Sequence, residues 1–392
     1  MVKNIFILLE EYLESYIKKN RLSIHPYIFI ECYSMTKILL ILLILVLSSC
    51  NKDELNSPIP DNLDSKFISA VDISRYPEIA SYNPLFFDLD GTQKDFLDIL
   101  KENKINTIRL RLWVKPDNEH SGFNEVKQFS QVLKSKGFRI WLSLHYSDTW
   151  ADPGHQETPL QWQGIGYPAL KDSVYNYTQK VVNKIHPDYI QIGNEINSGI
   201  LFPFGNIDNE PKNFKELLNA GITAVRKNST NTKIILHYAG IKGANYFFNQ
   251  VRSLDYDIIG LSFYPIWHGK SLDSLQNAMQ VLTQNYNKNI VIAETAYPFT
   301  LDANDWTNNI VGLEEQLILP DFPATNEGQK NFVAQIKTIT KNLNKGIGFC
   351  YWGAELIAWK GKQSTNASPW ENQALFDFNN KALPALKEFS AN

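Results

Sequence analysis

The chain has 392 residues, of which 44% are hydrophobic and 20% charged, so it can bury a sizeable core and is typical of a globular protein. Its formal net charge of −3 excludes the basic surface that a nucleic-acid-binding protein needs. Its 3 cysteines exclude a disulfide framework, and they do not have the spacing of a metal site.

The first 65 residues predict a targeting segment. Residues 38–47 are an unbroken apolar run of ten residues preceded by Lys37. This run is shorter than the roughly 20 residues that span a bilayer and is typical of a signal-peptide core. It ends in the sequence LSSC, which resembles a bacterial lipobox with Cys50 as the lipidated residue. We therefore expect a lipid anchor at Cys50.

The segments before and after Cys50 fit a lipoprotein. Residues 1–34 are an over-long start, residues 35–49 a lipoprotein signal peptide and residues 50–65 a flexible tether rich in Asn, Pro, Ser and Asp. The charged tract KDE at 52–54 resembles the surface-export signal of Bacteroidetes lipoproteins. We therefore expect a lipoprotein at the outer membrane, on the cell surface.

From residue 66 onward, strand-like runs alternate with helical patterns. The expected strands are 67–72, 106–112, 139–145, 189–193, 233–237, 257–263, 289–294 and 348–352. The main helical patterns are 93–102, 123–136, 174–185 and 212–227. Eight strands with helices between them, and no repeat or linker, predict a single (β/α)8 barrel over 66–392. The alternative, a doubly wound open sheet, needs a Gly-rich phosphate-binding first turn, which the sequence lacks.

Polar and aromatic side chains follow the carboxyl ends of all the expected strands. In chain order they are Asp72; Arg109 and Arg111; His145, Tyr146 and Asp148; Asn194 and Glu195; His237; Tyr264; Glu294; and Trp352. Any one of them could simply satisfy a wet loop, but the opposite strand ends carry no comparable set. Because active sites of (β/α)8 enzymes lie at the carboxyl ends of the strands, the sequence predicts a site at this mouth.

Glu195 and Glu294 are the most informative members of this set. A carboxylate is costly to bury without a partner, so each should lie at the lip of a cleft. Glu195 alone could equally cap a helix, but a second strand that ends in Glu294 indicates paired-carboxylate chemistry. Two carboxylates at a mouth lined by Trp and Tyr suit glycoside hydrolysis, in which one protonates the leaving oxygen and the other stabilises the oxocarbenium-like centre.

The two carboxylates must have different pKa values for this chemistry. Arg109 or Arg111 beneath Glu294, together with a hydrogen bond from Tyr264, would keep Glu294 ionised. Glu195 would then hold the proton. The neighbouring Asn194 would donate a hydrogen bond to a sugar hydroxyl.

Several sequence blocks resemble glycoside hydrolase family 53, the endo-β-1,4-galactanases. They are IRLRLW at 108–113, HYSDTWADPG at 145–154, GNEINSG at 193–199, GLSFYPIWHG at 260–269, ETAYPF at 294–299 and WENQALFD at 370–377. They follow one another over nearly all of residues 67–392. The Asn-Glu pair marks only the clan of (β/α)8 glycosidases, whereas HYSDTWADP marks the family.

This resemblance implies retaining endo-hydrolysis of β-1,4-galactan, as in the type I arabinogalactan side chains of pectin, through a covalent galactosyl-enzyme. Glu195 would be the acid/base and Glu294 the nucleophile, with no cofactor required for the chemistry. The implied substrate-binding or supporting residues are Arg109, Arg111, Trp113, His145, Asp148, Trp150, Asn194, His237, Tyr264, His268 and Trp352. Trp267 is a further sugar-contact candidate that could instead belong to the core. Phe202 stands where many family members have Trp, which implies an altered outlying platform.

Some bacterial relatives hold a structural calcium in loops after strands seven and eight. The corresponding oxygen-bearing residues here are Asp302, Asn304, Asn308, Ser368 and Glu371. Calcium prefers such oxygen ligands, but polar residues of a long loop can also be simply solvated, and the sequence leaves both alternatives open.

Two other functions remain open from the sequence. A clan relative could act on mannan or xylan, although the family-type blocks argue against it. A lipid-anchored glycan-binding protein could keep the fold without catalysis, although the presence of both glutamates, Asn194 and Tyr264 argues against that. We expect a polysaccharide substrate, no nucleic-acid partner and a monomer.

Overall fold

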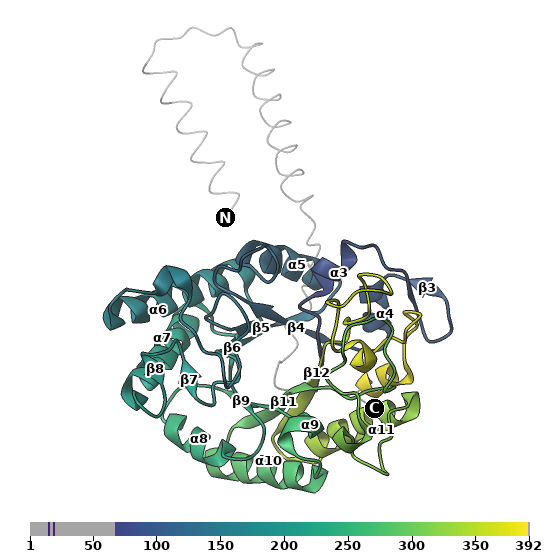
Figure 1. Ribbon diagram of the computed structural model, residues 1–392. Coiled ribbons are helices and arrows are strands. Elements are labelled where there is room, and N and C mark those ends of the chain that lie inside the picture. Colours follow the sequence, from purple (N-terminus) through teal and green to yellow (C-terminus); the bar gives the residue numbers. More distant parts are fainter. Residues whose placement is uncertain (1–14, 16–18, 20–66, 391–392) are drawn as a thin grey trace. The chain divides into compact units, whose positions relative to one another are not determined.

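The computed structural model describes residues 15, 19 and 67–390 of the chain (Figure 1), and the fold below is that of residues 67–390. The expected signal peptide, the Cys50 anchor and the tether lie outside the described residues, so these expectations stay predictions. Within the described residues, no helix has the length and apolar character needed to cross a bilayer.

Eight parallel strands close into a barrel (Figure 1). They are β1 (Ile68–Asp72), β4 (Thr107–Leu112), β5 (Arg139–Leu144), β6 (Tyr189–Ile192), β9 (Lys233–Ala239), β10 (Ile258–Ser262), β11 (Asn289–Thr295) and β12 (Gly346–Trp352). Each pairs with the next along the chain, and β1 pairs with both β4 and β12, which closes the barrel. The predicted (β/α)8 fold is confirmed, with strand ends shifted by a few residues.

Helices surround these strands (Figure 1). They are α3 (Tyr76–Ala80), α4 (Phe96–Glu102), α5 (Phe123–Ser135), α6 (Tyr167–Ile185), α7 (Pro211–Asn228), α8 (Ala244–Val251), α9 (Pro265–His268), α10 (Leu272–Tyr286) and α11 (Asn326–Lys341). Short elements lie in the loops: strands β2 (Phe86–Phe87), β3 (Gln93–Lys94), β7 (Gly199–Ile200) and β8 (Gly205–Asn206), and 3-10 turns η1 (Leu160–Trp162), η2 (Glu314–Gln316), η3 (Glu371–Gln373) and η4 (Pro384–Phe389).

One predicted helix begins in the wrong place. The pattern at 93–102 predicts a single helix, but residues 93–94 pair with β2, and α4 begins only at Phe96. The reason is Asp95, whose carboxylate accepts the backbone N–H groups of Leu97 and Asp98 at 3.1 and 3.2 Å. An aspartate in this position is a strong helix N-cap, so the chain stays extended before it.

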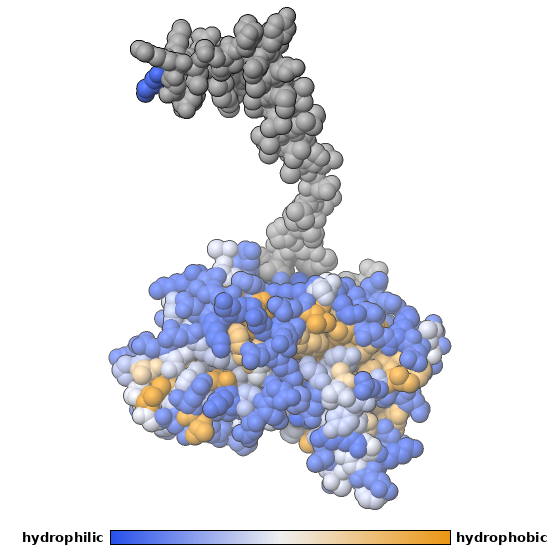
Figure 2. Space-filling model, turned by 90° about the horizontal axis from the view of Figure 1, so that it is seen from above, coloured by the Kyte–Doolittle hydropathy of each residue, from blue (hydrophilic) through white to orange (hydrophobic). Residues whose placement is uncertain are grey.

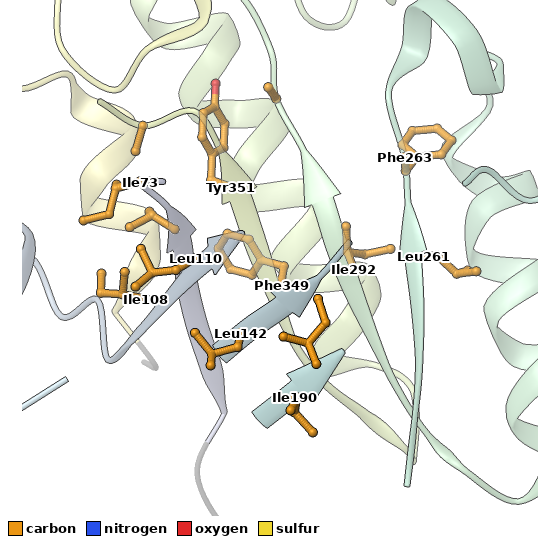
Figure 3. Close-up of a cluster of buried hydrophobic side chains, with 14 of the residues drawn as sticks. Ile73, Ile108, Leu110, Leu142, Ile190, Leu261, Phe263, Ile292, Phe349 and Tyr351 are labelled. Atoms are coloured by element: carbon orange, nitrogen blue, oxygen red, sulfur yellow. The ribbon is translucent and has the colours of Figure 1, made fainter. Parts of the chain in front are cut away.

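Side chains alternate between the two faces of the barrel wall, as the two-residue period of a strand requires. Outward-facing residues such as Ile108, Leu142 and Ile292 pack in the main core that links strands to helices (Figure 3). A second buried cluster fills the inside of the barrel: Ile68, Ala70, Trp141, Tyr189, Ile235, Ile258, Val291, Ala293 and Cys350.

The inward positions nearer the strand carboxyl ends are polar and buried. They are Asp72, Arg109, Ser143, Gln191, His237 and Ser262. The interior of the barrel is therefore an apolar plug with a polar layer above it. This layer is the floor on which the site described below is built.

The face of the molecule seen in Figure 2 is mainly hydrophilic, with hydrophobic residues in separate patches. Among the large hydrophobic side chains that remain exposed are Trp150 and Trp267, at 37% and 54%. Both also line the cavity at the barrel mouth, where an exposed aromatic ring can serve a ligand.

Candidate active site

A cavity of about 470 Å³ opens at the carboxyl ends of the barrel strands. Its lining combines charged and aromatic side chains: Asp72, Arg109, Arg111, His145, Trp150, Ala151, Asp152, Pro153, Asn194, Glu195, Ala239, Tyr264, Trp267, His268, Glu294, Trp352 and Trp370. This is the end of the barrel at which (β/α)8 enzymes carry their active sites, and it contains both predicted glutamates.

Glu294, near the end of β11, lies in a charged network. One of its carboxylate oxygens pairs with Arg109 Nη2 at 2.7 Å, and the other accepts the Tyr264 hydroxyl at 3.0 Å. The other terminal nitrogen of Arg109 pairs with Asp72 at 2.6 Å, and both partners are almost fully buried. The pKa of Glu294 is raised, chiefly by burial, while Arg109 and Tyr264 oppose the rise. These two contacts are the ones that favour the ionised form of Glu294.

Glu195 follows β6 in a tight turn. Gly193 has φ +83°, and a Cβ atom there would lie 2.4 Å from the Ile196 side chain, so glycine is required. Glu195 itself has φ +46°, a conformation that side chains other than glycine seldom adopt and that recurs at functional sites. Its N–H donates to His237 Nδ1 at 3.3 Å, which fixes the turn against β9.

The carboxyl group of Glu195 has a neutral hydrogen-bond partner, a serine hydroxyl. Ser262 donates its hydroxyl to Glu195 Oε1 at 2.5 Å. His237 Nε2 lies 2.8 Å from Ser262 Oγ. Because His237 Nδ1 accepts the Glu195 N–H, the ring proton lies on Nε2 and points at Ser262. Burial and the charge of Glu294 raise the pKa of Glu195 to about 8, although Ser262 and Arg109 oppose this.

The two glutamates lie close together but have different partners. A carboxylate oxygen of Glu195 and one of Glu294 lie within 4.8 Å of each other, and a ring nitrogen of His237 lies within the same distance of both. Such a cluster could in principle hold a metal. Here both His237 nitrogens already serve hydrogen bonds, and Glu294 already has a cationic partner in Arg109, so proton chemistry fits better.

Asn194 is fixed between the floor and the wall of the cavity. Its side-chain oxygen accepts from Arg109 at 2.8 Å, and its nitrogen donates to the Ala151 carbonyl at 2.8 Å. A side-chain amide has two N–H groups, so one remains for a ligand in the cavity that Asn194 lines.

Three of the predicted substrate-binding or supporting residues do not line the cavity. His237 is fully buried beneath Glu195. Asp148 joins two loops, because its two oxygens accept the backbone N–H groups of Lys115 and Leu160, each at 2.8 Å. Trp113 lies behind Trp150, with ring centroids 5.7 Å apart, and donates its ring N–H to His145.

Arg109 and Arg111, which the sequence offers as alternative partners of Glu294, differ in the structure. Arg109 makes the contact, whereas the guanidinium of Arg111 lies over the rings of Trp113 and Trp150. His145 lines the cavity, and burial together with the two arginines holds the pKa of His145 well below its usual range. His145 is therefore neutral, and because its Nδ1 accepts the N–H groups of Trp113 and Ala151, its ring proton lies on Nε2.

Aromatic rings form a continuous wall along the cavity. Successive ring centroids lie 6.0 Å apart for Trp150 and Trp352, 4.5 Å for Trp352 and Trp370, and 5.8 Å for Trp370 and Trp267. Trp267 is 54% exposed, so the alternative of a core residue is wrong. His268 lines the cavity beside it, packed against Gly240.

Sequence reasoning missed three residues of the site. Ser262 donates to Glu195, and Trp370 lines the cavity. Both stand inside the quoted GLSFYPIWHG and WENQALFD blocks, but nothing in either block alone indicates these positions. Asp152, which also lines the cavity, stands in the HYSDTWADPG block. The two-residue period of β10 was the available signal for Ser262, because it places Ser262 on the inner face.

The predicted calcium ligands lie in two neighbouring loops, but the buried oxygens without partners belong partly to other residues. Among the described residues, Asp305 Oδ2, Asn309 Oδ1 and Glu371 Oε2 are buried and accept no hydrogen bond. The backbone N–H groups of Asn304 and Asp305 donate to the other Glu371 oxygen, and Ser368 is buried. Asp302 and Asn308 are exposed.

The barrel and its carboxylate pair define a (β/α)8 glycoside hydrolase. Glu294 forms an ion pair with Arg109, whereas the raised pKa of Glu195 favours its protonated form. Comparison with known proteins agrees. Residues 68–389 match the model of glycosyl hydrolase family 53, and the chain belongs to that family.

Similar proteins include enzymes and solved structures of this family. An arabinogalactan endo-β-1,4-galactanase of Cellvibrio japonicus is 32% identical over 86% of this chain and 93% of its own length. A family 53 catalytic domain from Ignisphaera aggregans has a TM-score of 0.77 at 39% identity, covering 85% of this chain and 97% of that one. A fungal β-1,4-galactanase has a TM-score of 0.72 at 26% identity, covering 82% and 98%.

Proposed function

We propose that this chain is a retaining endo-β-1,4-galactanase in which Glu294 is the nucleophile and Glu195 the acid/base. The observation that carries the proposal is that the two acids have different partners. Glu294 pairs with the Arg109 guanidinium and accepts the Tyr264 hydroxyl. Among the described residues, the carboxyl group of Glu195 accepts only a serine hydroxyl. Their oxygens approach within 4.8 Å. Retaining enzymes place the two carboxyl groups about 5–5.5 Å apart, and inverting enzymes leave about 6.5–9.5 Å for a water.

The reaction follows from these settings in two steps. Glu195 gives its proton to the glycosidic oxygen as the bond to the anomeric carbon breaks, and Glu294 bonds to that carbon. Glu195, now a carboxylate, removes a proton from water. The resulting hydroxide displaces Glu294 from the sugar, so the anomeric configuration is retained and both acids return to their first state.

The substrate is inferred from the relatives together with the aromatic wall. Relatives that are named galactanases support β-1,4-galactan, such as the type I arabinogalactan side chains of pectin. The rings from Trp150 to Trp267 line the cavity one after another, and such a row of rings suits the binding of successive sugars of a long chain. No cofactor is needed for this chemistry.

One assay tests the proposal. The protein, Glu195→Gln and Glu294→Gln are incubated with β-1,4-galactan, mannan and xylan, and new reducing ends are measured. We expect rapid cleavage of galactan by the wild type only. If galactan stays intact, or if either variant keeps the wild-type rate, the proposal fails. Cleavage of mannan or xylan instead would favour the clan-relative alternative.

The location is a second part of the proposal. The lipobox-like LSSC sequence and the KDE tract support a lipoprotein anchored through Cys50 at the outer membrane and facing outward. Protease added to intact cells should remove the protein, and Cys50→Ala should release it from the membrane fraction. Retention of the Cys50→Ala protein in membranes would contradict the anchor.

We also propose that the chain acts as a monomer and that its two loops hold a structural calcium. Calcium prefers oxygen ligands, and Asp305, Asn309 and Glu371 each have a buried oxygen that accepts no bond from the described residues. Ser368 is buried in the same region. Light scattering tests the monomer, and thermal unfolding with and without calcium tests the ion.

A further inference from the structure

Two neighbouring helices of the outer layer, α8 and α10, are nearly free of charge (Figure 1). Helix α8 has no charged residue, and α10 has only Asp273, in its first turn. The other long helices, α5, α6, α7 and α11, each carry at least three charged residues. Because the solvent-facing side of a surface helix is usually charged, the exposed surface of α8 and α10 has an unusual composition.

Amide side chains take the place of the charges on this surface. The exposed amides of the two helices are Asn245, Asn249, Asn277, Gln280, Gln284 and Asn285. An amide offers two N–H donors and one carbonyl acceptor but has no net charge. Such a surface can form hydrogen bonds with a polar ligand without selecting for a charged one.

A groove of about 450 Å³ lies where the two helices meet. It is lined by Asn245, Tyr246, Asn249, Arg252, Asn285 and Tyr286. None of these residues lines the cavity at the barrel mouth, so the groove is separate from the active site. Among the described residues, Arg252 is the only charged residue that lines the groove, and no carboxylate does.

Hydrogen bonds between the two helices fix one side of the groove. Tyr286 donates its hydroxyl to the Asn245 carbonyl at 2.6 Å, and Asn285 Nδ2 donates to Asn245 Oδ1 at 2.9 Å. These bonds leave Asn245 Nδ2 and Asn285 Oδ1 without hydrogen-bond partners within residues 67–390. A donor and an acceptor are therefore held in place on side chains that line the groove.

Tyr246 supplies the apolar surface of the groove. Its side chain is 70% exposed, and among the described residues its ring contacts no other aromatic ring and its hydroxyl forms no hydrogen bond. An exposed aromatic ring beside fixed donors and acceptors suits a neutral pyranose, which has an apolar face and hydroxyl groups around its edge. Arg252 can donate to the same hydroxyl oxygens.

We propose that the groove between α8 and α10 is a second glycan-binding site, which holds a neutral polysaccharide on the ring of Tyr246. This inference rests on the proposed function for the identity of that polysaccharide, a β-1,4-galactan. A long chain bound at the groove keeps its other segments near the barrel mouth and so raises their effective concentration at the active site. An oligosaccharide too short to reach both sites has no such advantage.

Kinetics on a long and a short substrate test this site. Tyr246→Ala and the wild type are compared on β-1,4-galactan and on β-1,4-galactotetraose. For the variant we expect KM on the polymer to rise about fivefold, with kcat within about twofold and with unchanged kinetics on the tetraose. Tyr246→Phe keeps the ring and should keep the wild-type KM. No change on the polymer, or an equal change on both substrates, would overturn the proposal.

Tyr82 supplies the matched control. Its side chain is 53% exposed, and it lines neither the groove nor the cavity at the barrel mouth. Tyr82→Ala should leave both KM values unchanged, and both alanine variants should keep the wild-type thermal midpoint because exposed side chains contribute little to stability. If Tyr82→Ala raises KM on the polymer as much as Tyr246→Ala does, the groove is not a specific site.

Binding without cleavage separates this proposal from the proposed function. Retention on immobilised galactan, mannan and xylan is compared for Glu294→Gln and Glu294→Gln/Tyr246→Ala. Weaker retention of the double variant supports the groove on whichever polymer binds, even if the wild type does not cut galactan.

Two other occupants of the groove would overturn the proposal. Retention that is lost at high salt and in Glu294→Gln/Arg252→Gln, but not in Glu294→Gln/Tyr246→Ala, would indicate an anionic ligand. A dimer in light scattering that Tyr246→Ala converts to a monomer, with unchanged retention on the polymer, would indicate a second copy of this chain.

Discussion

Two regions of this molecule bury neighbouring acidic side chains, and the two regions differ in the partners that the carboxyl oxygens have. At the barrel mouth, Glu294 is paired with Arg109 and Tyr264, while Glu195 lies within 4.8 Å of it. In the two loops after β11 and β12, Asp305 and Glu371 lie together, and one oxygen of each accepts no bond from the described residues.

The difference indicates what each region is built to do. At the mouth the protein itself supplies a cation and donors to one acid and leaves the other a proton, which sets up proton transfer. In the loops the protein supplies only backbone N–H groups and leaves oxygens free, which suits an added cation.

The largest effect is expected from removing the acids at the mouth. Glu294→Ala should lower kcat on galactan by about 10⁴-fold or more, because no covalent intermediate can form. Added azide should restore turnover by bonding to the anomeric carbon, giving the α-azide in Glu294→Ala and the β-azide in Glu195→Ala. NMR of the products distinguishes the two. The same anomer from both variants would contradict the assigned roles.

Removing the cation at the mouth should have the next largest effect. Arg109→Met leaves Asp72 and Glu294 unpaired in a buried site, which should cost about 3–5 kcal/mol of unfolding free energy. It should also lower kcat by about 10²–10³-fold. Loss of the positive charge raises the pKa of Glu294, so the acid limb of the pH–rate profile should move to higher pH.

Arg226 is the matched control for this variant. It makes a comparable double contact, with Asp255 and Asp257, but these residues do not line the cavity. Arg226→Met should leave the pH profile unchanged, because this ion pair contacts neither Glu195 nor Glu294. If Arg109→Met also leaves the acid limb in place, Arg109 does not control the ionisation of Glu294.

A smaller effect, a shift of the alkaline limb of the pH–rate profile, is expected from changing Ser262. Glu195 must be protonated to act as the acid, and its pKa of about 8 predicts that kcat/KM falls as pH rises through that value. Ser262 donates to the carboxylate and so favours ionisation. Ser262→Ala should therefore move the alkaline limb up by about one pH unit and lower the rate several-fold. Ser143→Ala, in the same polar floor, should leave the limb where it is.

The sequence predicted the barrel and the two acids well because both depend on local patterns. Alternating strands and helices define the fold, and a strand followed by Glu195 or Glu294 places each acid at the mouth. The sequence could not choose between Arg109 and Arg111, although both lie on the inner face of β4. Arg109 reaches Glu294 and Arg111 does not because the two lie at different heights along β4, which only the assembled barrel shows.

Loops were harder to predict for a related reason. Asp148 looks like a site residue from its motif, but its oxygens are used by the backbone of Lys115 and Leu160. The oxygens that the structure leaves without a partner at Asp305 and Asn309 lie one residue from the predicted calcium ligands Asn304 and Asn308. In a long loop no period of two or 3.6 residues fixes which side chains point inward, so hydrogen bonding decides it.

The smallest effect is expected in these loops. Calcium should raise the thermal midpoint by about 2–6 °C, and a chelator should reverse the change, because a ligand of the folded state alone stabilises it. Asp305→Asn and Glu371→Gln should abolish the calcium effect, whereas Asp302→Asn, at an exposed position, should keep it. The opposite pattern would return the site to the residues read from the motif.

The pH dependence of the calcium effect separates ion binding from a general salt effect. Burial raises the pKa of Glu371 in the folded protein. Without the ion, its contribution to stability is therefore greatest below the unfolded value of about 4.3 and is lost as pH rises through the folded value. Calcium binds the carboxylate, so its stabilising effect should grow over that same rise in pH. A gain in thermal midpoint that is equal at pH 5 and pH 8, or that magnesium reproduces fully, would contradict a calcium site at Glu371.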